Sequence, residues 1–219
     1  MSLVLVLANQ YGIVMTADKR LTLNPKPTPD GQALLYSSLN YQQKVFTTKS
    51  GHGIAYTGNL IADDGSPISA IIKKFLLSLS ASSISIQEEL SALKTELKIH
   101  ATSQNIIMIG AAVKNGICEV FQTTLVDDKI EEITNENGIC ISAIGDNKIA
   151  LELMSQQQIN SNCLLFSLQE GVNYLRFINA TASKLQYYNG WLQSISESCD
   201  VLVINETHAQ WINSPEILS

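Results

Sequence analysis

The fold is decided by residues 12–20, which read GIVMTADKR. A turn glycine leads into a run of apolar and β-branched residues, and the run ends at three charged residues. A similar aliphatic run, Leu3–Ala8, comes shortly before it. Two such runs on either side of a short turn predict a β-hairpin. Because the first run is continuously apolar instead of alternating, we expect both of its faces to be covered.

The rest of the chain repeats the strand pattern and interrupts it twice with pairs of helices. Strands are predicted at Lys44–Thr47, Gly53–Tyr56, Asn105–Val113, Ile117–Thr124, Lys129–Ile133, Ile139–Ile144, Asp200–Ile204 and Ala209–Ile212. Helices are predicted at Ile68–Leu79, around Leu90–Leu97, at Asp146–Gln157 and at Gln169–Gln193. The four strands between residues 105 and 144 are expected to form a meander. This order predicts an α+β fold, a four-layer αββα sandwich in which two stacked antiparallel sheets carry helices on both outer faces.

Length and composition indicate one globular domain spanning residues 1–219, because the chain is 45% hydrophobic and only 16% charged. Within it, the proline-rich segment Leu23–Gln43 is predicted to be a long surface loop. The net charge is -6 without a cluster of Lys and Arg, which argues against a nucleic-acid partner. No apolar run is long enough to span a membrane. We therefore expect a cytoplasmic protein.

Neither metal nor cofactor binding is expected from the remaining chemistry-bearing residues. His52, His100 and His208 are far apart in the sequence and are interpreted as surface or edge residues. The four cysteines occur singly, as expected for reduced thiols. Asp63 and Asp64 are predicted to open the first helix and to favour its N-terminus electrostatically. The two tryptophans, at 191 and 211, are interpreted as packing residues.

Residues 12–20 resemble the second-strand signature G-V-V-x-A-x-D-x-R of proteasome β subunits and related bacterial ring proteases, which are N-terminal nucleophile hydrolases. If Ser2 takes the place of the family's first mature residue, Asp18 and Arg20 fall at the family's offsets without a gap. Lys44, with Gly58 fourteen residues later, is similar to the family's catalytic lysine and oxyanion glycine. The connection between the two motifs is longer than in the family.

The resemblance implies acyl transfer on a peptide or amide substrate, with Ser2 as the nucleophile once Met1 has been removed. An N-terminal residue can use its own α-amine as the base, because that amine titrates near neutral pH. By the same resemblance Lys44 supplies positive charge beside Asp18, Arg20 orients the acid, and the Gly58 N–H donates to the oxyanion. A homo-oligomer is expected, in the ring form that the family adopts, while any unfoldase partner is left open.

Three departures from the family keep a second hypothesis open. The nucleophile is Ser where the family most often has Thr, and Asp146 stands where a small Ser assists near the α-amine. A carboxylate there either holds the ammonium or raises the pKa of the amine and weakens it as a base. The segment 194–198 lacks the family's Asp-x-x-Ser-Gly-Gly, with Ser194 and Ser198 as candidates in its place. The alternative is a catalytically silent, proteasome-like structural or partner-binding subunit.

Overall fold

The computed structural model describes residues 2–22, 38–39, 42–79, 84–101, 105–155, 162–191 and 193–212. Most of the proline-rich segment, residues 23–37 and 40–41, therefore lies outside the described part of the chain. The strands are β1 Leu3–Asn9, β2 Gly12–Asp18, β3 Leu21–Thr22, β4 Ser38–Leu39, β5 Val45–Thr47, β6 Gly53–Gly58, β7 Ile106–Lys114, β8 Ile117–Thr124, β9 Glu131–Glu132, β10 Cys140–Gly145, β11 Cys199–Ile204 and β12 Ala209–Trp211. The helices are α1 Ile68–Ser78, α2 Ile86–His100, α3 Lys148–Met154 and α5 Leu168–Tyr188.

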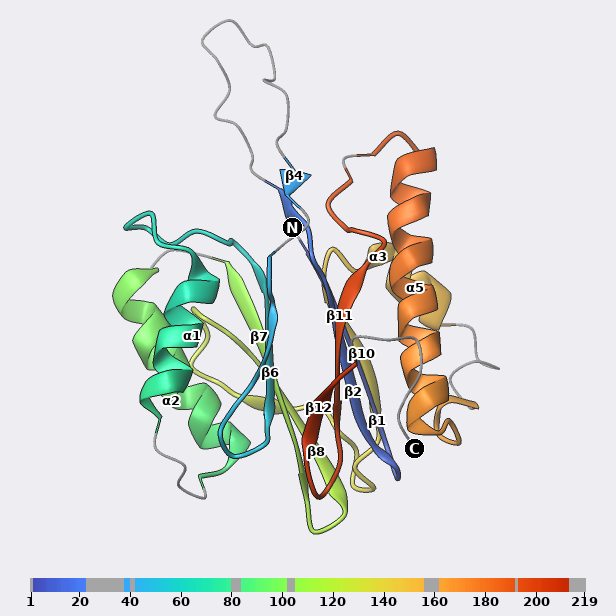
Figure 1. The fold of residues 1–219 in the computed structure, drawn as a ribbon, viewed down its shortest axis with the longest axis horizontal. Helices are drawn as coiled ribbons and strands as arrows, with labels where there is room; N and C mark the ends of the chain where they lie inside the picture. Colours follow the sequence, from blue (N-terminus) through green and yellow to red (C-terminus); the bar gives the residue numbers. More distant parts are fainter. Residues whose placement is uncertain are drawn as a thin grey trace, which may run out of the picture.

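Two five-stranded antiparallel sheets form the centre of the molecule (Figure 1). One has the strand order β10-β1-β2-β11-β12 and the other has the order β5-β6-β7-β8-β9. The predicted β1–β2 hairpin is confirmed, with Asn9 opposite Gly12 at its turn, and so are the hairpins β5–β6 and β11–β12. The α+β class is therefore confirmed, while β3 and β4 form a separate two-stranded pair.

The predicted meander of four strands is wrong at its last member. Strands β7, β8 and β9 pair in sequence, but β10 crosses to the other sheet and pairs with β1. The residues between β9 and β10 are typical turn formers. They predict that the chain reverses direction, but they do not determine which sheet the next strand joins. The crossing places Gly145 opposite Leu3, so the end of β10 lies beside the start of β1.

Three buried apolar clusters hold the sheets and helices together. Helices α1 and α2 pack on the sheet that contains β7, and α3 and α5 pack on the sheet that contains β1 (Figure 1). The third cluster lies between the two sheets. Along β1, Leu3, Leu5 and Leu7 belong to the helix-facing cluster, whereas Val4 and Val6 belong to the one between the sheets. Both faces of β1 are thus covered, as its continuous apolar run predicts.

Helix α1 begins at Ile68, as predicted, but it follows Pro67, so Asp63 and Asp64 lie ahead of the helix and their predicted role at its N-terminus is wrong. Proline with its fixed φ is suited to a helix start, and it overrides the acidic pair. Helices α3 and α5 end earlier than predicted, at Met154 and Tyr188. None of the described helices is both long and apolar enough to cross a membrane.

Capping boxes define the starts of α2 and α5. Ser85 accepts from the backbone N–H of Glu88, whose carboxylate accepts from the N–H of Ser85, and Ser167 and Glu170 do the same at α5.

The interpretation of Trp191 as a packing residue is wrong, because it is 49% exposed. Its ring lies 5.9 Å from the ammonium of Lys148.

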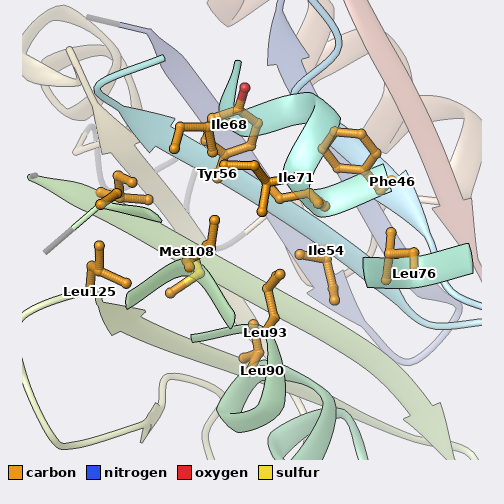
Figure 2. Packing of buried hydrophobic residues seen from close by; sticks show 14 of the residues in the cluster. Phe46, Ile54, Tyr56, Ile68, Ile71, Leu76, Leu90, Leu93, Met108 and Leu125 are labelled. Carbon is orange, nitrogen blue, oxygen red and sulfur yellow. The ribbon is translucent and has the colours of Figure 1, made fainter. Parts of the chain in front are cut away.

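The cluster under α1 and α2 predicts a large stability effect at Leu90, which is fully buried on α2 (Figure 2). We expect Leu90→Ala to lower the free energy of unfolding by about 2–5 kcal/mol, because it removes apolar contacts and leaves a cavity. Leu77→Ala on α1 is the matched control, since Leu77 is 75% exposed, and should change stability by less than about 0.5 kcal/mol. Urea unfolding of both variants measures the difference. Equal effects would contradict this assignment of the core.

Candidate active site

The carboxylate of Asp18 joins four segments of the chain at the end of β2. Its Oδ1 accepts from the backbone N–H of Leu3 at 2.8 Å and from the Lys44 ammonium at 3.0 Å. Its Oδ2 accepts from the backbone N–H groups of Arg20 at 2.8 Å and Ser196 at 3.4 Å. The side chain is fully buried. All of the hydrogen-bonding capacity of this buried charge is therefore used, as its desolvation requires.

Lys44 is the counter-ion of Asp18 and is equally buried, with 0% of its side chain exposed. Its ammonium also donates to the carbonyl oxygen of Arg20 at 2.6 Å. Burial lowers the pKa of Lys44 from its usual value, while the charge of Asp18 and their hydrogen bond oppose that shift. A buried ammonium with a lowered pKa beside a carboxylate is the kind of group that active sites use to stabilise developing negative charge.

Ser2 lies directly beside this ion pair, because the next residue, Leu3, donates its N–H to Asp18. Ser2 is fully buried. Its carbonyl oxygen accepts from the Thr57 hydroxyl at 2.9 Å and from the Asp146 backbone N–H at 2.8 Å. Its own hydroxyl has no hydrogen-bond partner among the described residues. A buried unpaired hydroxyl is costly, so this one is a candidate for a reacting group.

Met1, whose removal the sequence predicts, lies outside the described residues. The main chain of Ser2 is nevertheless fixed on two sides. Gly145, which carries the chain from β10 toward Asp146, has a φ of +90°, and a Cβ there would lie 1.9 Å from the carbonyl oxygen of Ser2. Only glycine allows the two backbones to approach so closely.

The remaining predicted residues surround this centre. The Arg20 guanidinium donates to the carbonyl oxygen of Gln193 at 3.0 Å and so links the end of β2 to the segment before β11. Gly58 ends β6, one residue after Thr57, with a φ of +107° that favours glycine. The structure thus places the candidate oxyanion glycine next to the residue that holds the carbonyl of Ser2.

Asp146 carries a second polar network. Its Oδ2 accepts from the Gln186 side-chain amide at 2.7 Å and from the hydroxyl of Ser194, which is buried. Ser194 is therefore part of the site, whereas Ser198 contacts Ser196 through its carbonyl oxygen. Gln186 was not predicted. Gln186 is one of three polar residues on the buried face of α5, with Asn179 and Ser183, and helical spacing alone does not single it out.

The histidines lie in other interactions. His52 pairs with Glu89 at 2.9 Å, and His100 pairs with Asp64 at 3.0 Å. Within the described ranges, no three His, Cys, Asp or Glu residues are grouped as metal ligands would be. All four cysteines are free thiols.

Comparison with known proteins supports the fold. No protein-family model matches the chain. No curated protein matches it either. Among solved structures, a mutant of Anbu from Hyphomicrobium sp. strain MC1 is similar, with 14% sequence identity and a TM-score of 0.56 over 97% of this chain and 87% of that chain. The likeness shows that this chain shares the fold of that protein.

The buried ion pair predicts a strong dependence of stability on Asp18. We expect Asp18→Asn to lower the free energy of unfolding by about 3–5 kcal/mol, because Lys44 is left buried without a counter-charge. Asp200→Asn is the matched control. It breaks the Lys19–Asp200 pair, whose side chains are 36% and 23% exposed, and should cost no more than about 1 kcal/mol. Denaturant unfolding at neutral pH compares the two, and a loss at Asp18 no larger than at Asp200 would disprove the role of the buried pair.

Proposed function

We propose that this chain is a proteasome-like N-terminal nucleophile hydrolase that cleaves peptide or amide bonds through Ser2. One observation carries the proposal. A fully buried serine with an unpaired hydroxyl is attached, through the N–H of the next residue, to a buried aspartate–lysine pair. Lys44 and Asp18 lie far apart in the sequence, so the tertiary fold brings them into contact and not their proximity along the chain.

The chemistry follows from these positions. Removal of Met1 would give Ser2 a free α-amine, which takes the hydroxyl proton directly or through water. The hydroxyl oxygen then attacks the substrate carbonyl while the nearby Lys44 ammonium stabilises the negative charge. Asp18 holds Lys44 in place, and the Gly58 N–H is the proposed donor to the oxyanion. The amine returns the proton to the leaving group, and water hydrolyses the ester intermediate to regenerate Ser2.

The architecture supports the same assignment at a coarser level. Apolar clusters lie between the sheets and under the helices on each outer side, which supports a four-layer αββα sandwich within a single domain. With the fold shared with Anbu, we propose a cytoplasmic homo-oligomer, ring-shaped as in the family that the sequence resembles.

A silent structural subunit is the second candidate, and one observation favours it. The backbone N–H of Asp146 donates to the carbonyl oxygen of Ser2, and the side chain of this same residue is a carboxylate. A nearby negative charge favours the ammonium form of an α-amine, so less of the neutral base is present at a given pH. If that effect is large enough, the processed chain folds and assembles without hydrolysing substrate.

Mass spectrometry and active-site labelling separate the two candidates. We expect the natively expressed protein to lack Met1 and to react with a β-lactone at Ser2, because that hydroxyl is the activated nucleophile. Ser2→Ala and Lys44→Ala should abolish labelling, and Lys44→Met provides a second variant of similar side-chain length. Ser155→Ala removes an exposed serine and should label like the wild type. Peptide mapping identifies the modified residue.

Circular dichroism of each variant provides the folding control for this experiment. A processed, folded wild-type protein that never reacts would contradict the hydrolase proposal and support the silent subunit. Reaction at another serine would contradict the assignment of Ser2.

A further inference from the structure

Helix α5 presents three polar residues on its buried face, at positions 179, 183 and 186. Asn179, Ser183 and Gln186 are each at most 2% exposed, so their polar groups need partners within the protein. All three bind the segment 194–197, which precedes β11. The bonds run from Asn179 Nδ2 to the carbonyl oxygens of Ser196 and Glu197, from Ser183 Oγ to the carbonyl oxygen of Ile195, and from the N–H groups of Ser194 and Ile195 to Gln186 Oε1.

Gln186 differs from the other two because its amide also reaches the site. Its Nε2 lies 2.7 Å from Asp146 Oδ2 and 3.0 Å from Ser194 Oγ. Ser194 in turn donates to the same carboxylate oxygen of Asp146. The backbone N–H of Asp146 donates to the carbonyl oxygen of Ser2 at 2.8 Å. Asp146 therefore connects the two regions, because its carboxylate binds Gln186 on the buried face of α5 and its backbone N–H binds the main chain of Ser2.

We propose that Gln186 and Ser194 are positioning residues of the Ser2 site, which hold the carboxylate of Asp146, the residue whose backbone N–H binds the Ser2 carbonyl oxygen, and determine how strongly its charge acts on the amine of the processed chain. The inference rests on the proposed function. It goes beyond that function because it assigns to α5 and the segment 194–197 the control of the nucleophile's base, a role that the aspartate–lysine pair does not fill.

The proposal predicts opposite effects of removing the charge and of removing its donors. The Asp146 charge favours the ammonium form of the Ser2 amine, so removing it should lower the pKa of that amine. The hydrogen bonds from Gln186 and Ser194 partly compensate the negative charge of the Asp146 carboxylate. Removing either donor should therefore strengthen the effect of that charge on the amine and raise the pKa of the amine. The other charged groups here, Asp18, Lys44, Arg20 and Lys148, are unchanged in every variant and cancel in the comparison.

The experiment measures the rate of β-lactone labelling at Ser2 as a function of pH in the full, processed chain. The rate rises with pH as the amine becomes neutral. For Asp146→Asn we expect this rise to move to lower pH by about 0.5–1 unit. For Ser194→Ala and Gln186→Leu we expect it to move to higher pH by about 0.3–0.5 unit. A purely structural role would change the rate or the melting temperature and leave the midpoint of the rise in place.

Ser183→Ala is the matched control, because Ser183 is buried on the same face of α5 and binds the same segment through Ile195 without contacting Asp146. Its midpoint should equal that of the wild type. If Gln186→Leu does not fold, Ser194→Ala and Asp146→Asn carry the test. Wild-type midpoints in all variants, with normal labelling of the wild type, would overturn this inference alone. A processed wild type that labels at no pH would overturn the hydrolase proposal and this inference with it.

Discussion

The burial of one carboxylate, that of Asp18, constrains the arrangement of the rest of the site. A charge with no access to water is tolerated only if donors surround it, and here they come from the start of β1, the residues after β2, the residue before β5 and the segment before β11. If any one of these donors moved away, one acceptor position of the buried carboxylate would lose its partner. The position of Ser2 follows directly, because the N–H of Leu3 is one of the four.

Ser2 lies where the two sheets come together, and both of them hold its main chain. The sheet that contains β1 supplies Asp18 and, through β10, the turn at Asp146, while the other sheet supplies the hydroxyl of Thr57 from β6. The backbone is thus held at its carbonyl and through the next N–H, but the hydroxyl of Ser2 is left without a partner among the described residues. This distribution of bonds fixes the backbone of Ser2 and leaves its hydroxyl available for the proposed chemistry.

The sequence predicts the β1–β2 hairpin because it follows from local pattern, whereas the Asp18–Lys44 contact is implied by the resemblance to proteasome β subunits. The transfer of β10 to the sheet of β1 was not predictable, since its apolar residues suit either sheet and only tertiary pairing chooses between them. Asp63 and Asp64 were misplaced because Pro67, four residues after Asp63, sets the helix start. Gln186 was missed because its partners, Asp146 and Ser194, lie 40 and 8 residues away and nothing in the sequence links the three.

Asp146 decides how the two candidate functions are weighed. Asp18 and Lys44 are a close, fully buried pair of opposite charge, whereas the carboxylate of Asp146 has no cationic partner among the ion pairs of the described residues. The partly buried carboxylate of Asp146 accepts hydrogen bonds from Gln186 and Ser194, two residues that are each 2% exposed, and Gln186 also binds the backbone of the segment before β11. Two buried side chains are therefore used to hold the carboxylate of the residue whose backbone N–H binds the carbonyl oxygen of Ser2, which is the arrangement expected if that charge acts on the proposed nucleophile.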